Sequence, residues 1–213
     1  MDVDSWWLLL EGAWTTTWIS AIAIAFGVSF GLIIALIRMM KIPVVDQLLV
    51  LYISWARATP LVTLVLFLFL SLPTFNINMD KHAAAILSLT LNTAAFNAEI
   101  WRNAFINFPR EQREAAESVG MRRFTFFRRI MLPQMLIVSL PALVNEMSFL
   151  IKGSPAIAVI GIVDLTRVTN RISSVTYEPL YPILAAALLY IIIIGVLVKL
   201  QGVAEKHARR LAR

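Results

Sequence analysis

The stretch Arg110-Glu-Gln-Arg-Glu-Ala-Ala-Glu-Ser-Val-Gly120 decides how the rest of this chain is interpreted. It starts a charged insert between two apolar stretches, each about long enough to cross a bilayer. Pro109 suits the first turn of a helix, and Gly120 suits the left-handed residue at its end. The sequence therefore predicts a short polar helix held between two membrane-spanning helices.

The predicted helix has a place where a second molecule can approach its backbone closely. Glu111, Glu114 and Glu117 recur every three residues, and Ala115 and Ala116 between them carry only a methyl group. A membrane protein that docks a soluble partner needs a close, rigid contact of this kind. We therefore predict that this helix docks such a partner on the cytoplasmic side of the membrane.

Composition and charge indicate a membrane protein. Of the 213 residues, 59% are hydrophobic and 15% are charged, whereas a soluble domain usually carries about a quarter charged residues. The net charge of +6 comes from cations at the ends of apolar blocks, where the positive-inside rule expects them, which argues against a nucleic-acid partner. The chain has no cysteine, which excludes disulfides and thiolate chemistry.

Five apolar blocks predict five membrane-spanning helices, at about residues 14–37, 44–72, 83–105, 130–151 and 179–198. Arg57, Thr59 and Pro60 interrupt the second block. Residues 73–82 are expected to form an outside loop, and residues 156–171 a shorter helix outside or at the interface. The expected fold class is an all-α integral membrane protein, with residues 1–213 in a single domain.

The distribution of charges predicts how the chain is oriented. Asp2, Asp4 and Glu11 precede the first apolar block, and Arg38 and Lys41 follow it. The positive-inside rule therefore places the N-terminus outside and the end of the first block in the cytoplasm. After the last block comes a basic tail, expected in the cytoplasm, with Lys199, Lys206, Arg209, Arg210 and Arg213.

Glu114-Ala115-Ala116, Gly120 and Leu132-Pro133-Gln134 resemble the EAA loop of bacterial ABC importer permeases. The resemblance implies that residues 107–130 are the coupling segment, whose helix sits in a groove of an ATPase subunit. The coupling residues that it implies are Glu114, Ala115, Ala116, Gly120 and Pro133. The chain departs from the family at Glu111, because a glycine commonly precedes the glutamine there.

A second set of motifs resembles the polar amino-acid branch of these permeases. It comprises Tyr52, Arg57-Ala-Thr-Pro-Leu61, Leu91-Asn-Thr-Ala-Ala-Phe96, Glu99-Ile-Trp-Arg102, Asn145 and Lys152-Gly-Ser154. Departures occur at Ala58, where the family often has glycine, and at Gly153-Ser154-Pro155. The resemblance covers about residues 15–200. It implies the permease subunit of an ATP-driven importer that moves a polar amino acid by alternating access, with cationic amino acids among the candidates.

The resemblance also implies the partners of the chain. These are two ATPase subunits, a second permease subunit that is identical or paralogous, an extracytoplasmic binding protein, and the bilayer of the bacterial inner membrane. The chain itself has no catalytic residues and no P-loop, so ATP and Mg²⁺ are expected in the ATPase subunit. A channel or secondary transporter is the main rival, and it would need a carboxylate relay deep in the spans.

Arg57, Glu99, Glu146 and Lys152 are ionisable residues inside predicted spans, which makes them functional candidates. Glu99 has a simple alternative, an ion pair with Arg102 three residues later. Arg57 either borders the translocation path beside Thr59 and Pro60 or packs against carbonyls of a partner subunit. Lys152 suits a side chain that extends to the outer interface.

Glu146 follows Asn145 near the outer end of the fourth span. Its carboxylate could bind the ammonium of an amino acid or a cationic side chain, and the resemblance favours a cationic amino acid. The alternative is a carboxylate neutralised by Lys152 or Arg57 in a subunit interface. The predicted substrate pathway comprises Glu146, Asn145, Arg57, Thr59 and Glu99.

The remaining signals are weaker. Gly27-x-x-x-Gly31 predicts close packing of the first helix against another. Asp164, Arg167 and Arg171 either contact a binding protein or form a solvated face. His82 and His207 are isolated, so no metal site is expected.

Overall fold

A computed structural model describes the backbone of residues 2–211 and the side chains up to residue 206. The predictions for Arg209, Arg210, Arg213 and His207 therefore lie outside the described side chains. Within the described range the chain forms helices and loops and no strand. In chain order the helices are α1 (Val3–Met39), α2 (Pro43–Ala58), α3 (Leu61–Ser71), the 3-10 helix η1 (Leu72–Phe75), α4 (Lys81–Ile106), α5 (Arg110–Ser118), α6 (Arg123–Phe126), the π-helix η2 (Phe127–Met131), α7 (Leu132–Gly153), the 3-10 helix η3 (Ser154–Ile160), α8 (Leu165–Thr176) and α9 (Leu180–Leu211).

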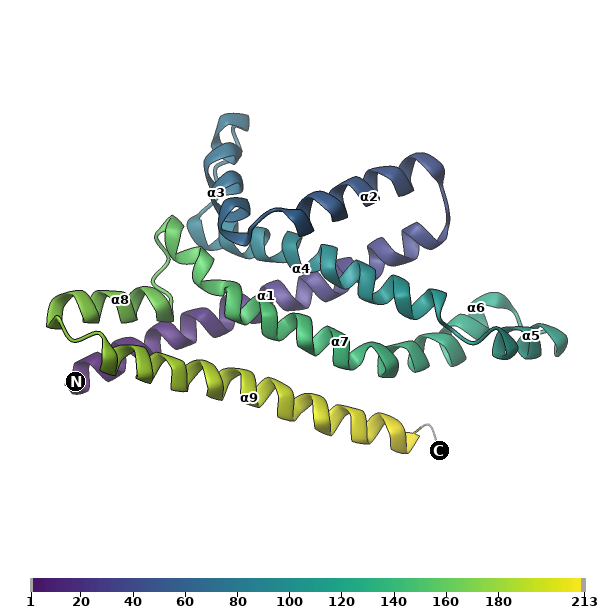
Figure 1. The fold of residues 1–213 in the computed structure, drawn as a ribbon. Helices are drawn as coiled ribbons and strands as arrows, with labels where there is room; N and C mark the ends of the chain where they lie inside the picture. The colour runs from purple at the N-terminus through teal and green to yellow at the C-terminus, as the bar shows by residue number, and fades with distance from the viewer. Residues whose placement is uncertain (1, 212–213) are drawn as a thin grey trace.

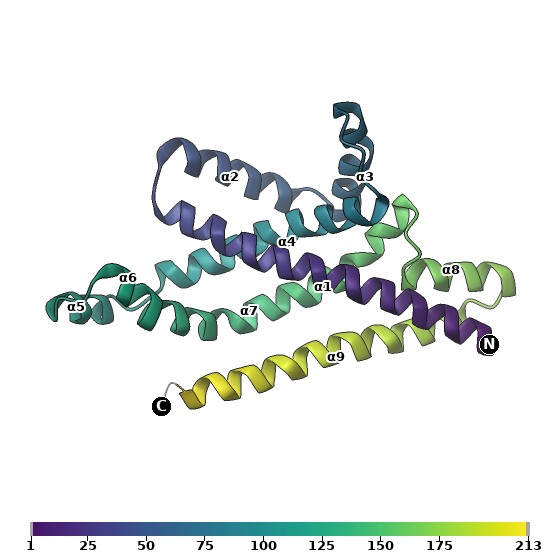
Figure 2. The same ribbon diagram turned by 180° about the vertical axis from the view of Figure 1, so that it is seen from behind.

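Helices α1, α4, α7 and α9 lie alongside one another and give the molecule two distinct ends (Figure 1). The start of α1 and α8 lie at one end, and α5, α6 and the end of α9 lie at the other (Figure 2). We call these the α8 end and the α5 end. Helices α1, α4 and α9 run toward the α5 end, and α7 runs back. This order agrees with an N-terminus and a C-terminus on opposite sides of a membrane.

Three helical segments within the described residues are long and apolar enough to cross a membrane, namely Val3–Met39, Arg123–Ile160 and Leu180–Lys206. The bent pair Pro43–Ala58 and Leu61–Phe75 would add a fourth if it forms one span. Helix α4 is more polar, and it carries its polar residues on surfaces buried by its neighbours. The count of five spans therefore stays a prediction.

The prediction of one helix over residues 44–72 is wrong. The chain breaks between α2 and α3, and the two helices are bent by 113° relative to each other. Pro60 has no N–H to continue the helix, and it forces Thr59 into an extended conformation. The interruption that the sequence indicated at Arg57, Thr59 and Pro60 is a sharp elbow.

Two other boundaries differ from the prediction. Helix α1 begins at Val3, well before the predicted residue 14. The segment 156–171 is not one helix, because η3 ends at Gly161, whose φ of +90° reverses the chain. Helix α8 then begins at Leu165 after Asp164, whose side chain accepts the backbone N–H groups of Thr166 and Arg167.

The core is built around α4, which packs most extensively against α1. The predicted close-packing role of Gly27 and Gly31 is confirmed. A Cβ atom built on Gly27 would lie 2.0 Å from Cγ2 of Thr93, and one on Gly31 would lie 2.6 Å from Cβ of Asn97. The glycines therefore let α4 bring polar residues against the backbone of α1.

Candidate functional site

The predicted docking helix is present as α5, and its end has the predicted geometry. Gly120 has a φ of +69°, in the left-handed region. Its N–H donates to the carbonyl of Glu117 at 3.0 Å, and the N–H of Met121 donates to that of Ala116 at 3.0 Å. These bonds satisfy carbonyl groups at the end of the helix, as a left-handed glycine usually allows.

The two alanines of α5 point in different directions. Ala116 is only 6% exposed and packs within its own chain against Phe105, Phe126 and Met131. Ala115 is exposed, as is Glu114. Ala116 therefore anchors α5 to the bundle, whereas Ala115 is exposed, and the coupling role of both residues stays a prediction.

Polar side chains connect α5 to the first turn of α7. The amide of Gln134 donates to the side-chain oxygen of Gln112 at 2.9 Å. Pro133 is the second residue of α7, directly after the π-helix η2, and its ring has no N–H to donate to the carbonyls of the preceding turn. The π-helix η2 precedes it and joins α7 to α6, so the segment around α5 is continuous with a long helix of the bundle. Helices α5 and α7 are therefore linked through the chain and through the hydrogen bond between Gln112 and Gln134.

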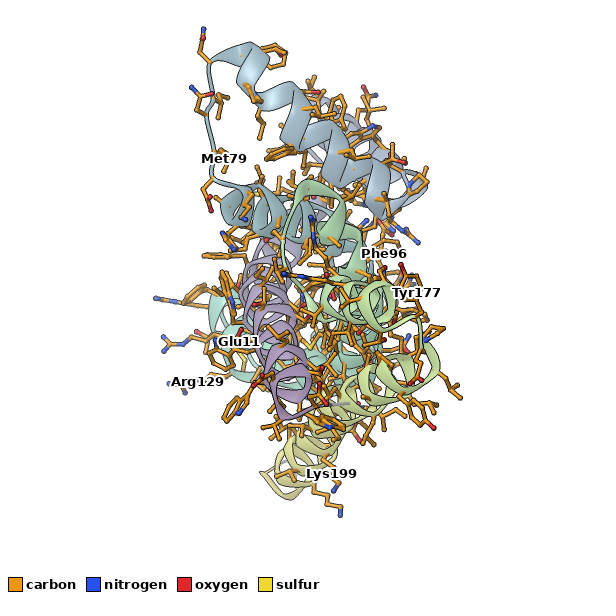
Figure 3. The ribbon with its side chains drawn as sticks, turned by 90° about the vertical axis from the view of Figure 1, so that its left-hand side faces the viewer. Glu11, Met79, Phe96, Arg129, Tyr177 and Lys199 are labelled. Atoms are coloured by element: carbon orange, nitrogen blue, oxygen red, sulfur yellow. The ribbon has the colours of Figure 1, made fainter. Side chains whose placement is uncertain are left out.

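The exposed cations of this end surround the α5–α6 segment. They comprise Arg110, Arg113, Arg122, Arg123, Arg128 and Arg129. Figure 3 looks along the bundle and shows the side chains of Arg129 and Lys199 projecting outward from the ribbon. This end has the basic character that the sequence predicted for the cytoplasmic side.

A buried polar line joins α4 to α7 at the middle of the bundle. Thr93 donates its hydroxyl to Oε1 of Glu146 at 3.4 Å, and Asn97 donates its amide to the hydroxyl of Thr93 at 3.1 Å. Thr93 and Asn97 are fully buried, whereas Glu146 is half-buried and its neighbour Asn145 is exposed. The carboxylate of Glu146 is thus held at one edge while it remains open to a ligand.

Neutralisation of Glu146 by Lys152 or Arg57 in a subunit interface stays a prediction beside the substrate contact. Among the described residues of this chain, no cation lies within ion-pair distance of its carboxylate. Lys152 instead places its ammonium 5.5 Å from the centre of the Phe149 ring. Glu146 therefore has spare capacity to accept a cationic group.

Glu99 forms an ion-pair network that the sequence only partly indicated. The predicted pair with Arg102 is present at 3.6 Å, but Glu99 also accepts a hydrogen bond from Arg38 of α1. Arg38 in turn lies 2.9 Å from Asp46 of α2. From the sequence, Arg38 indicates only the orientation of the chain in the membrane. Nothing in the local pattern shows which distant acidic residue it contacts.

Arg57 and Glu99 line one hollow of about 480 Å³ between α2 and α4. The guanidinium of Arg57 lies 5.1 Å from the centre of the Phe96 ring, a cation–π contact. Thr59 lies at the end of α2, and its hydroxyl donates to the carbonyl of Trp55 at 2.8 Å. The structure therefore brings Arg57 and Glu99 together, while Thr59 serves the elbow and Asn145 stands on the exposed side of α7.

The α8 end holds a second hollow, of about 690 Å³, between α8 and the start of α1. Arg167, Arg171 and Asp2 line it. Asp164 does not face outward, because it is buried and caps α8. Burial raises the pKa of Asp164, and the backbone N–H groups of Arg167 and Thr166 oppose that rise. Of the three predicted contact residues, the two arginines are exposed, and Arg167 also donates a hydrogen bond to the carbonyl of Ala158 at 2.8 Å.

Comparisons with known proteins agree with this arrangement. The chain is 35% identical over 201 residues to PatM of Vibrio harveyi, described as a probable amino-acid ABC transporter permease, with 93% of this chain and 90% of that protein covered. It is 34% identical over 192 residues to GlnP of Escherichia coli K12, a glutamine transport system permease, with 89% and 88% covered. Both relatives are transporter permeases rather than enzymes.

A solved structure and a family model extend the comparison. The crystal structure of an amino acid ABC transporter with histidines superposes with a TM-score of 0.85 at 34% identity, over 94% of each chain. The family described as binding-protein-dependent transport system inner membrane component matches residues 27–210. This protein therefore belongs to that family of inner-membrane permeases of ABC transporters.

Proposed function

We propose that this chain is the permease subunit of an ATP-driven importer that moves a polar amino acid into the cytoplasm. One observation carries the proposal. The same helix, α7, carries the open carboxylate of Glu146 and, at its other end, the hydrogen bond from Gln134 to the docking helix α5. A solute site and an ATPase contact on one rigid element are what an ATP-driven pump requires.

The proposed orientation places the α5 end in the cytoplasm and the α8 end outside. Two ATPase subunits then dock on α5 through the surface of Ala115 and Glu114, and an extracytoplasmic binding protein docks at the α8 end, where Arg167 and Arg171 are exposed. A second permease subunit, identical or paralogous, completes the pathway. A single chain, in which α2 and α3 are bent by 113° relative to each other, does not shield a polar solute from lipid.

The carboxylate of Glu146 favours a substrate that carries a positively charged group. The relatives and the solved structure are named for amino acids, among them glutamine and histidine. Every amino acid has an ammonium that a carboxylate can pair with, and Glu146 lacks a described ion-pair partner. A cationic side chain would fit the same carboxylate, so we place cationic amino acids first among the candidates.

Transport by this subunit follows from two states of the bundle. Closure of the ATPases on ATP moves the two docking helices together, and α7 carries this displacement to Glu146. ATP binding therefore favours the outward-facing state, and hydrolysis allows the return, which is a shift of populations between two states. The ion pair of Glu99 with Arg38 holds α1 and α4 together as one body during this movement.

The substitution Glu146→Gln tests the proposed role of this residue. It keeps the size of the side chain and its hydrogen bond with Thr93 but removes the charge. In proteoliposomes that hold the complete complex and ATP, we expect uptake of L-histidine, L-arginine or L-glutamine to fall at least tenfold. The matched control is Glu11→Gln, an exposed residue of α1 away from the site, which should leave uptake unchanged.

Two outcomes would contradict the proposal in different ways. Normal uptake and affinity in Glu146→Gln would remove this residue from the substrate site while leaving the importer function intact. Transport by the permease alone, in liposomes without ATP, would instead favour the channel or secondary transporter.

A further inference from the structure

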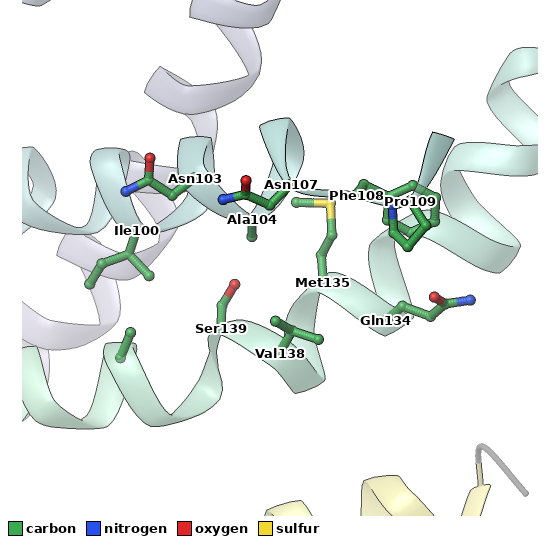
Figure 4. A pocket seen from close by; sticks show the side chains of 11 residues that line it. Ile100, Asn103, Ala104, Asn107, Phe108, Pro109, Gln134, Met135, Val138 and Ser139 are labelled. Carbon is green, nitrogen blue, oxygen red and sulfur yellow. The ribbon is translucent and has the colours of Figure 1, made fainter. Parts of the chain in front are cut away.

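A cavity that the proposed solute site does not include lies next to the docking helix (Figure 4). It has a volume of about 380 Å³, within the range of small-molecule sites. Its walls are the last turns of α4, the linker at Phe108 and Pro109, and the first turns of α7. Apolar side chains such as Ile100 and Met135 alternate with polar ones along these walls.

Ser139 gives this cavity an unsatisfied buried hydroxyl. The residue is 2% exposed, and its Oγ has no hydrogen-bond partner among the described residues. Figure 4 shows this hydroxyl directed from α7 toward the space below α4. Ser148 on the same helix instead donates to the carbonyl of Val144 at 2.9 Å. Buried hydroxyls are rarely left without a partner, so Ser139 is a place where a ligand atom would be stabilised.

The cavity lies in line with Glu146. Ser139 precedes Glu146 by seven residues, which is two helical turns, so both residues lie on one face of α7 about 10 Å apart along its axis. On α4, Asn97 lies between the two places, and its Oδ1 also lacks a partner among the described residues. Two buried polar atoms without a described partner, Oδ1 of Asn97 and Oγ of Ser139, thus lie on the α5 side of Glu146.

The chemistry of the walls fits a zwitterion. Asn103, Asn107 and Gln134 each offer an amide donor and an amide acceptor, and Ser139 adds a hydroxyl. Donors suit an α-carboxylate and acceptors suit an α-ammonium, while none of the lining side chains is charged. A site without charge holds a zwitterion weakly, which suits a place from which solute leaves for the cytoplasm.

From these observations we infer that the cavity is a second, inner binding station for the amino-acid group of the transported solute, reached after Glu146. This inference rests on the proposed importer function. The wall residue Gln134 is hydrogen-bonded to Gln112 of α5, so the station changes shape when the docking helix moves. Solute in the inner station is therefore released in step with the ATPase cycle.

The absence of cysteine from the chain allows a direct test. Asn103→Cys places one thiol in the exposed part of the cavity wall. The complete complex without ATP, in nanodiscs, is treated with a membrane-impermeant methanethiosulfonate reagent, and modification of this chain is followed by mass spectrometry. Uptake by the unmodified complex first identifies the transported amino acid among L-histidine, L-arginine and L-glutamine. We expect that amino acid to slow modification of the thiol at least threefold.

Further variants separate the station from the rest of the pathway. Adding Ser139→Leu fills the cavity and should abolish the protection, and the milder Ser139→Ala should weaken it. Adding Glu146→Gln should leave the protection in place at saturating amino acid, because the inner station has its own contacts. A single cysteine at the matched control Lys206→Cys, on exposed α9, should react at one rate with and without amino acid.

The outcomes distinguish the inner station from the importer function. Two results would overturn the inner station alone. One is normal uptake together with modification of Asn103→Cys that amino acid does not slow. The other is protection from modification that persists in both Ser139→Leu and Ser139→Ala. A complex that takes up none of the three amino acids would overturn both the importer function and the station.

Discussion

Gly27 and Gly31 of α1 show how a missing side chain can position a functional one. The space beside them is occupied by Thr93 and Asn97, which form the hydrogen bonds that lead to Glu146. At Gly31 the nearest atoms include the backbone nitrogen of Ala98, at 3.0 Å from a built Cβ, so a side-chain rotation cannot relieve the contact. The spacing of α1 and α4 is therefore fixed by these two residues.

Gly31→Ala is expected to destabilise the protein. The added methyl group must push α1 away from α4, and such overpacking typically costs about 1–3 kcal/mol. The measurement is the thermal unfolding midpoint of the purified complex in mild detergent. Gly195→Ala in α9 is the matched control, because a Cβ there meets nothing within 4 Å. Equal midpoints for the two variants would show that α1 and α4 are not closely packed in the membrane.

At the scale of the element, α5 depends on its left-handed end. Gly120→Val should impair ATPase binding, because a side chain at a φ of +69° costs about 1–2 kcal/mol and the helix would end elsewhere. We expect the variant to insert into the membrane but to lose the ATPase during purification. Gly120→Asn tolerates the same backbone conformation and should retain it. A fully retained ATPase in Gly120→Val would separate this turn from docking.

The start of α4 is expected to make stability depend on pH. Asp80 accepts the backbone N–H of His82 and lies 2.9 Å from its ring nitrogen, and these hydrogen bonds lower the pKa of Asp80. A lowered pKa means that the folded state binds the proton less tightly, so the stabilisation is present at neutral pH. This stabilisation is lost as the pH falls from 3.8, the ordinary pKa of aspartate, to below the lowered pKa of the folded state.

Asp80→Ala should therefore lower the unfolding midpoint at pH 7, and the difference from the wild type should shrink as the pH falls below 3.8. The measurement is a series of thermal unfolding curves between neutral and acidic pH. Asp80→Asn keeps a capping oxygen without the charge, so its loss at pH 7 should be smaller than that of Asp80→Ala and should also shrink as the pH falls below 3.8. A difference that stays constant over the whole range would exclude the carboxylate as its cause.

At the scale of the whole molecule, exposed apolar surface predicts an assembly in lipid. Helices α2 and α3 expose large apolar side chains such as Leu48, Leu51 and Phe67.

The importer function predicts a complex that survives purification. After purification in mild detergent, we expect an ATPase in about equal amount to the permease, identified by mass spectrometry. A second permease sequence in the sample would indicate a heterodimer. Recovery of the chain alone, still active in liposomes without ATP, would contradict the importer assignment.

The sequence by itself determined those features that depend on local chemistry. Runs of apolar residues identified a membrane protein, because crossing a bilayer requires a continuous apolar surface. Pro60 broke the second block, and Gly120 ended the docking helix, because each residue restricts or permits particular backbone angles. The family motifs around Glu114 could also be identified from the sequence alone, since they are contiguous.

Only the tertiary structure decided which distant residues meet. Arg38 and Glu99 are 61 residues apart and Thr93 and Glu146 are 53 apart, and nothing in their local patterns pairs them. The inward direction of Ala116 and the unsatisfied hydroxyl of Ser139 likewise depend on what packs against them. The physical reason is that hydropathy and backbone angles act within a few residues, whereas ion pairs, buried polar lines and cavities arise when whole helices pack together.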